Sequence, residues 1–170
     1  MPLDNTKKLK LFMPAKEEVE VYRLGLLIGY FSKQITVEWA DKIIEKSDKP
    51  DYIFIETSLS KNKDKNEIIH LLESFKGKYN KNLPVKILVS LMHQDLKDDI
   101  ITALEFSRYF NRLSEVSEVP SEDKIWMICF DDEYEEARGG LFGDIDSLNK
   151  ELINYFSKYK KFKFKFNDFV

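Results

Sequence analysis

The chain has 170 residues, 43% of them hydrophobic and 34% charged, with a formal net charge of −3. This size and composition exclude a disordered chain and favour one globular domain with a substantial core. The near-balance of acidic and basic residues argues against a nucleic-acid partner, which requires a clustered basic surface. The single cysteine excludes an internal disulfide. Neither a signal peptide nor a membrane-spanning run of about 20 apolar residues stands out, so we expect a cytoplasmic protein.

Apolar residues recur at helical spacing along most of the chain, and only 6 glycines and 5 prolines interrupt them. We expect an N-terminal arm over residues 1–15, a single helical domain over residues 16–159 and a tail over residues 160–170. Helical segments are predicted, in chain order, around Val19–Tyr30, Val37–Ile44, Tyr52–Leu59, Ile68–Phe75, Pro84–Met92, Asp98–Arg112, Ile125–Ala137 and Ser147–Phe156. The predicted fold is all-α, an irregular bundle of about eight short helices packed as antiparallel pairs.

Local features predict how some of these helices begin, end and pack. Gly25 and Gly29 lie four residues apart on one helical face, and this spacing predicts close packing against another helix. Thr36 is expected to cap the second helix. A short break over residues 94–97 is expected to separate the fifth helix from the sixth, whose apolar face would include Ile100.

Two stretches are compatible with more than one secondary structure. Residues 52–59 are rich in β-branched and aromatic side chains, which suits a buried strand, but Pro50-Asp51 at their start favours a short helix. Residues 162–166 alternate phenylalanine and lysine with a period of two. This pattern fits either an edge strand or an extended C-terminal arm.

No residue pattern typical of a catalytic, phosphate-binding or metal site is found. His70 and His93 are the only histidines and lack metal-ligand spacing, so both are expected at the surface or partly packed. Cys129 lies in an apolar run and is expected to be a buried, inert thiol. We therefore predict a protein that is not an enzyme and needs no cofactor or metal. An enzyme would require Cys129 and a histidine to meet in a cleft.

The seventh helix changes from an apolar to an acidic composition along its length. We expect Trp126, Phe130, Tyr134 and Ala137 to face the core, because they recur on one helical face, and Gly139-Gly140 to end the helix. The carboxylates of this segment are then expected to face solvent. They are Asp131, Asp132, Glu133, Glu135, Glu136, Asp144 and Asp146.

Three interpretations of this acidic segment are open. It is a solvated polar face, a docking surface for a basic protein partner, or a site for a divalent cation. The spacing of a calcium-binding loop is absent. Carboxylates four residues apart on a helix repel each other, and cations of a partner would relieve that repulsion and speed association. We take the seven carboxylates as the candidate partner-binding site.

Two parts of the sequence carry a family resemblance. The first is Tyr-Arg-Leu-Gly-Leu-Leu-Ile-Gly-Tyr at residues 22–30, followed by Val-Glu-Trp-Ala-Asp-Lys-Ile-Ile at residues 37–44. The second is Phe-Asp-Asp-Glu-Tyr-Glu-Glu-Ala at residues 130–137 with Gly-Leu-Phe-Gly-Asp at residues 140–144. They resemble small helical bacterial proteins of uncharacterised families, several of which are encoded beside polymorphic or contact-dependent toxins as immunity proteins.

The resemblance implies a cytoplasmic, cofactor-free protein that neutralises a cognate toxin by binding it, and it transfers no catalytic residue. Such toxins are frequently basic, which suits the acidic segment. The alternative is a small regulatory or scaffold domain that binds a peptide or protein in a groove between helices. Tyr22 and Trp39 would line that groove.

Overall fold

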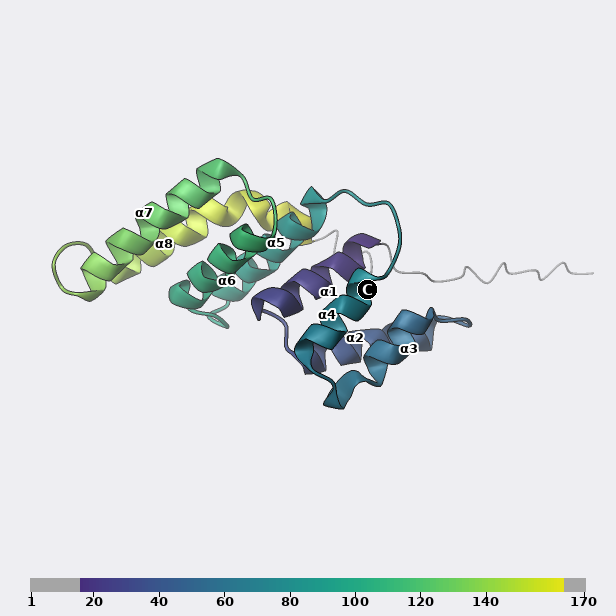
Figure 1. Ribbon diagram of the computed structural model, residues 1–170. Helices are drawn as coiled ribbons and strands as arrows, with labels where there is room; N and C mark the ends of the chain where they lie inside the picture. The colour runs from purple at the N-terminus through teal and green to yellow at the C-terminus, as the bar shows by residue number, and fades with distance from the viewer. Residues whose placement is uncertain (1–15, 164–170) are drawn as a thin grey trace, which may run out of the picture.

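The computed structural model describes residues 16–163, which fold into eight α-helices and two 3-10 helices without a strand (Figure 1). The helices are α1 (Lys16–Ile28), α2 (Lys33–Lys46), α3 (Tyr52–Ser58), η1 (Ser60–Asn62), α4 (Lys65–Glu73), α5 (Asn82–Lys97), α6 (Ala103–Val116), α7 (Ser121–Arg138), α8 (Ile145–Phe156) and η2 (Ser157–Phe162). The predicted all-α fold is confirmed. The predictions for the N-terminal arm and for residues 164–170 lie outside the described residues.

Helix α1 lies in the middle of the molecule, between α2–α4 on one side and α5–α6 on the other (Figure 1). Nine of its 13 residues are buried, including Glu18 and Glu20, as expected for a helix that is covered on opposite faces. One face contributes Val19, Tyr22 and Leu26 to a first core shared with α2, α3 and α4. The other contributes Val21, Leu24 and Ile28 to a second core shared with α5–α8 and η2.

Stacked aromatic rings fill the first core. The rings of Tyr22 and Trp39 stack with centroids 4.1 Å apart, and Phe54 meets Trp39 edge to face at 5.5 Å. Such pairs contribute about 1 kcal/mol each beyond the area they bury. Because Tyr22 and Trp39 are buried here, they do not line a surface groove as the scaffold hypothesis expected.

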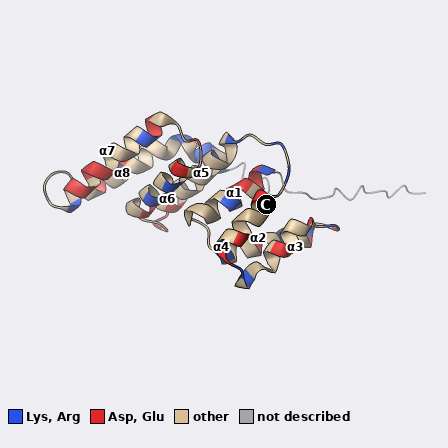
Figure 2. Ribbon diagram, viewed as in Figure 1, with Lys and Arg blue, Asp and Glu red and all other residues tan. Residues whose placement is uncertain are grey.

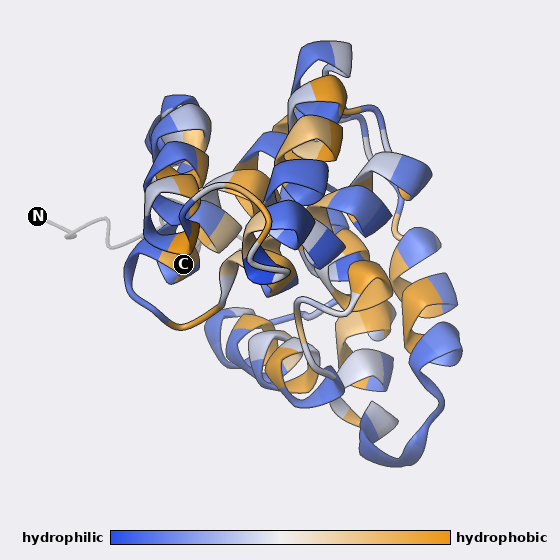
Figure 3. Ribbon diagram, turned by 90° about the vertical axis from the view of Figure 1, so that its left-hand side faces the viewer, coloured by the Kyte–Doolittle hydropathy of each residue, from blue (hydrophilic) through white to orange (hydrophobic). Residues whose placement is uncertain are grey.

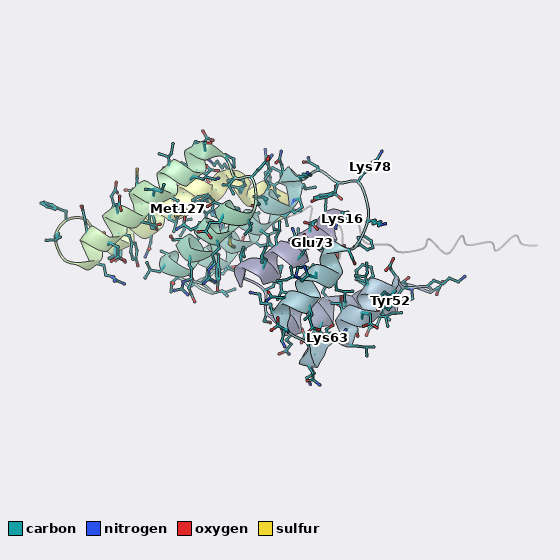
Figure 4. The ribbon with its side chains drawn as sticks, viewed as in Figure 1. Lys16, Tyr52, Lys63, Glu73, Lys78 and Met127 are labelled. Carbon is teal, nitrogen blue, oxygen red and sulfur yellow. The ribbon has the colours of Figure 1, made fainter. Side chains whose placement is uncertain are left out.

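Helix α3 confirms the helical interpretation of residues 52–59. Asp51 caps its first turn, since the carboxylate accepts a hydrogen bond from the amide of Ile53 at 2.9 Å. Phe54 and Thr57 point into the protein, whereas Tyr52 at the start of the helix is exposed (Figure 4). The β-branched composition was therefore outweighed by the cap and by packing against α2 and α4.

The chain reversal after α1 corrects two predictions. Gly29 ends the helix with a φ of +84°, and a side chain at Gly25 would collide with the ring of Phe31, at 2.3 Å from Cδ2. The two glycines therefore allow the chain to fold back onto α1, and helix–helix packing does not explain them. Ser32 caps α2, accepting from the amide of Ile35 at 3.2 Å, while the expected cap Thr36 is buried inside the helix.

The junction of α5 and α6 also differs from the prediction. Helix α5 continues through the expected break at residues 94–97, and the chain turns at residues 98–102. A capping box begins α6: Thr102 Oγ1 accepts from the Glu105 amide at 3.2 Å, and Glu105 accepts from the Thr102 amide at 2.8 Å. Ile100 lies in the turn and is 66% exposed, so it is not part of the apolar face of α6.

Helices α7 and α8 form an antiparallel hairpin at one end of the molecule, with their connecting loop projecting furthest from α1 (Figure 1). Trp126 stacks on Tyr155 of α8 with centroids 4.1 Å apart and on Phe130 at 5.5 Å. Met127, labelled in Figure 4, is fully buried beside this stack. The predicted inward face of the seventh helix is therefore confirmed, and Met127 belongs to it as well.

Candidate protein-binding surface

Five of the seven predicted acidic residues lie on the half of α7 nearest the hairpin loop, and Asp144 and Asp146 lie at the start of α8 (Figure 2). Of the seven carboxylates, Asp131 is half-buried and the other six are exposed. The structure thus brings most of them onto one end of the hairpin. It also gives several of them a local partner that the sequence did not indicate.

Asp131 was expected to face solvent, and this prediction is wrong. Its carboxylate accepts hydrogen bonds from Ser107 Oγ at 2.5 Å and from Asn111 Nδ2 at 3.0 Å, both on α6. It therefore fastens α7 to α6 and is not available to a partner. The spacing of apolar residues in α7 could not indicate this contact. Asp131 lies on a polar side of the helix, and α6 packs against that side.

Two other carboxylates stabilise the start of α8. Asp144 is the N-cap residue and accepts from the side chain of Ser147 at 2.8 Å and from its backbone amide at 2.9 Å. These two hydrogen bonds lower the pKa of Asp144. Asp146 lies in the first turn of the helix, where a negative charge interacts favourably with the helix dipole. Both residues therefore have a local structural role.

Four exposed carboxylates remain on α7, and we call Asp132, Glu133, Glu135 and Glu136 the acidic surface. Glu135 pairs with Arg138 at 3.2 Å, but both side chains are more than half exposed and the pair contributes little. Within residues 16–163, no lysine, arginine or histidine lies within ion-pair distance of the other three.

The acidic surface lowers the local stability of α7. Asp132 and Glu136 are like charges one turn apart, and Glu135 and Glu136 lie in the last turn, at the negative end of the helix dipole. Each of these effects costs a few tenths of a kcal/mol. Helix stability therefore gives no reason for this concentration of acid.

Exposed apolar side chains continue the same outer face toward the start of α7. Ile125 and Ile128 are 63% and 60% exposed, and Cys129 beside them is exposed as well. The prediction of a buried thiol at Cys129 is wrong, because Trp126, Met127 and Phe130 already occupy the inward face. The spacing Ile125, Ile128, Asp132 could have revealed a second, partly apolar face in the sequence.

The loop between α7 and α8 carries two further exposed apolar residues, Leu141 and Phe142. Figure 3 views the molecule from the side on which this loop lies, and hydrophobic residues there are interleaved with hydrophilic ones along the ribbons. Beside the loop is a hollow of about 240 Å³, lined by Glu133, Glu136, Phe142, Gly143 and Leu148. Gly139-Gly140 ends α7 as predicted, and the exposed apolar pair follows directly after it.

A second hollow, of about 540 Å³, lies beside α2 and α3. All but one of its lining residues have polar or charged side chains: Lys33, Gln34, Val37, Glu38, Asp41, Ser58 and Lys61. Ser58 donates a short hydrogen bond to Asp41, and Lys33 donates to the carbonyl of Lys63 at 2.8 Å. Because these groups are already hydrogen-bonded within the protein, this hollow supports a binding role less well than the hairpin does.

The histidines and the thiol do not come together as a catalytic group. His93, expected at or near the surface, is buried, and its Nε2 lies 2.8 Å from the carbonyl oxygen of Ile153. Burial lowers the pKa of His93, although this hydrogen bond opposes the shift. His70 is exposed beside Glu73 on α4. Across residues 16–163, no three His, Cys, Asp or Glu side chains are grouped so that they could hold a metal ion.

None of the helices described for this chain combines the length and the apolar character needed to cross a membrane. Comparison with known proteins gave no match to a protein-family model, to a curated protein or to a solved structure.

Proposed function

We propose that this chain is a non-catalytic immunity protein that neutralises a cognate bacterial toxin in the cytoplasm by binding it through the outer face of α7. The observation that carries this proposal is the acidic surface, where three exposed carboxylates have no ion-pair partner within the described residues. The resemblance to immunity proteins supplies the class of partner, a basic toxin domain.

The composition of the surface suits a protein partner. Exposed Ile125 and Ile128 offer apolar area at one end, and Leu141 and Phe142 offer it at the other. The acidic surface lies between them. In protein interfaces, buried apolar and aromatic anchors supply most of the affinity, while complementary charges speed the encounter and select the partner. A binder of this kind should associate more slowly as the salt concentration rises.

The test is co-expression with the toxin domain encoded by the adjacent gene. The wild-type chain should restore growth and co-purify with the domain. A variant with lysine at the four positions of the acidic surface should bind at least about 100-fold more weakly, because attraction becomes repulsion at several contacts. Circular dichroism should be unchanged, since all four residues are exposed.

A matched control reverses the same number of exposed carboxylates elsewhere on the molecule. Suitable positions are Glu38, Glu45, Asp48 and Glu115. This variant has the same net charge as the first, so a general effect of charge would weaken both equally. Equal loss in the two variants, or unchanged binding in the first, would refute α7 as the interface. Absence of growth rescue by the wild-type chain would refute the immunity function itself.

A further inference from the structure

Leu141 and Phe142, at the tip of the α7–α8 hairpin, are the most exposed large hydrophobic side chains in residues 16–163, at 70% and 79%. They are adjacent in sequence and lie next to the acidic surface. An isolated exposed apolar residue is ordinary, but a contiguous exposed pair beside a charged rim is typical of interaction sites. Packing within the protein does not explain why Leu141 and Phe142 are apolar, because both side chains are exposed.

The backbone of the tip is held in one conformation. Gly140 has a φ of +73°, its amide donates to the Ala137 carbonyl at 3.1 Å, and the Leu141 amide donates to the Glu136 carbonyl at 3.1 Å. This is the Schellman arrangement that commonly ends helices. In that arrangement the residue at the position of Leu141 usually packs back on the helix, yet here it is exposed. The tip therefore presents its apolar side chains from a preorganised loop, which reduces the entropy lost on binding.

The hollow beside the tip combines an apolar lining with a charged rim. Leu148 is buried and Phe142 forms one side, while Glu133 and Glu136 lie one helical turn apart on α7. Its volume of about 240 Å³ is smaller than a typical pocket for a cofactor or drug-sized ligand. The size and the lining suit a single long side chain.

We propose that this hollow receives one arginine or lysine side chain of the protein partner, while Leu141 and Phe142 pack against an apolar patch beside that residue. The inference rests on the proposed function, because it names the contact through which the partner is held. The aliphatic stem of the basic side chain would lie along Leu148 and Phe142, as such stems do on apolar surfaces. Its charged head would meet Glu133 and Glu136 and the face of the Phe142 ring.

The occupant follows from charge complementarity. Two carboxylates without a cation in the described residues exclude an acidic or phosphorylated ligand. A neutral apolar side chain would leave both carboxylates partly desolvated and unpaired, which is costly. A basic side chain fits both parts of the hollow, because its aliphatic stem can contact Phe142 and Leu148 while its charged head pairs with Glu133 and Glu136.

The probe is Nα-acetyl-arginine amide, titrated into the ¹⁵N-labelled full chain and followed by NMR, with Nα-acetyl-norleucine amide as the uncharged control. We expect the arginine amide to shift the backbone amides of Phe142 and Gly143, and the norleucine amide to shift them much less. Replacing Glu133 and Glu136 by glutamine should weaken binding about fivefold, the effect of losing exposed or half-exposed ion pairs. Phe142→Ser should weaken it as well.

The matched control replaces Glu38 and Glu45, two exposed carboxylates on α2, by glutamine, which removes the same charge far from the hollow (Figure 1). Its effect should stay below about twofold, because charges more than a Debye length from the hollow are screened by salt. Equal effects of the two pairs, or shifts of amides elsewhere on the molecule, would overturn the hollow as a binding site. So would calcium chloride shifting the same amides more strongly than the arginine amide, or a concentration-dependent dimer formed through the tip.

The outcomes separate this inference from the proposed function. If the toxin domain binds the wild-type chain and not the four-lysine variant, but neutralising Glu133 and Glu136 leaves its binding unchanged, α7 is the interface and the hollow is not its anchor. If the arginine amide binds in the hollow and the toxin domain does not bind, the site stands and the immunity function is wrong.

Discussion

The two cores of the molecule each bury a carboxylate and accommodate it in different ways. In the second core, Asp123 is fully buried and accepts hydrogen bonds from Tyr155 at 2.9 Å, Lys158 at 2.5 Å and Tyr159 at 2.5 Å. In the first core, Glu18 is 1% exposed and accepts one hydrogen bond, from the Trp39 indole at 2.8 Å. Its other oxygen is buried without a partner among the described residues.

The difference affects the titration of the groups involved. Burial raises the pKa of Glu18 to about 7, and the bond from Trp39 opposes the shift only in part. Around Asp123, the pKa values of the hydrogen-bond donors are shifted. Burial and the hydrogen bond to Asp123 raise the pKa of Tyr159. Burial lowers the pKa of Lys158, but the hydrogen bonds to Asp123 and Tyr155 and the charge of Asp123 together outweigh burial, so that the pKa of Lys158 is raised. A buried carboxylate is thus tolerated either with several donors or with a proton of its own.

The largest expected effect tests the second core. Asp123→Ala should lower the free energy of unfolding by about 4 kcal/mol, because it leaves the hydroxyls of Tyr155 and Tyr159 without their acceptor, whereas exposed Lys158 keeps solvent and Glu122. Urea denaturation followed by circular dichroism measures the change. Asp132→Ala, at an exposed position on the same helix, should change stability by less than about 0.5 kcal/mol. A small effect at Asp123 would show that its hydrogen bonds only balance its desolvation.

The next effect tests the first core through pH. The pKa of Glu18 is about 7 in the folded protein, above its ordinary value of 4.5. Between these values the folded state holds a proton that the unfolded state has lost, so stability is highest below pH 4.5 for this group and falls as pH rises to about 7. The loss should reach roughly 3 kcal/mol, and Glu18→Gln should remove it.

Urea denaturation between pH 5 and pH 8 measures this difference. Glu45→Gln, an exposed carboxylate on α2, serves as the control and should leave the pH dependence unchanged. An identical pH profile for the wild-type chain and Glu18→Gln would mean that Glu18 is solvated or paired, and the contrast between the two cores would disappear.

A smaller effect tests how the turn after α1 is attached to the second core. Tyr30 follows α1 and donates a hydrogen bond of 2.6 Å to Asp95 on α5. Tyr30→Phe should lower the free energy of unfolding by about 1.5 kcal/mol, because the bond is to a carboxylate and is half-buried. The urea transition should remain single, since α1 belongs to both cores. Two separate transitions would indicate that the cores unfold independently.

The smallest effect concerns the acidic surface. Glu136→Lys should raise stability by about 0.5 kcal/mol, because it converts a repulsion with Asp132 into an attraction and places a cation near the C-terminal end of α7. Asp132→Lys should gain less, since it lies further from that end. The same Glu136→Lys change should weaken partner binding. A gain in stability without a loss of binding would favour the interpretation of α7 as a merely solvated face.

Much of the local structure could be predicted from the sequence. Periodicity placed the helices, and it identified Trp126, Phe130, Tyr134 and Ala137 as the inward face of α7. Gly139-Gly140 was correctly identified as its end. The predictions that were wrong are of two kinds. The cap of α2, the junction of α5 and α6, and the close approach of Phe31 to Gly25 are local features that periodicity does not resolve. The contact of Asp131 with Ser107 depends on a distant element, the helix α6 that packs against α7.

The sequence alone therefore determined the fold class, the number of helices and the amphipathic character of α7. These follow from spacing and capping, which act within one or two helical turns. Only the tertiary structure decided which carboxylates are covered and which remain free. The solvent exposure of a residue depends on which other helix packs against it. Helix α1 has apolar residues on opposite faces, but its sequence does not indicate which helices cover each face. The contrast between Glu18, Asp123 and the acidic surface arises from that packing.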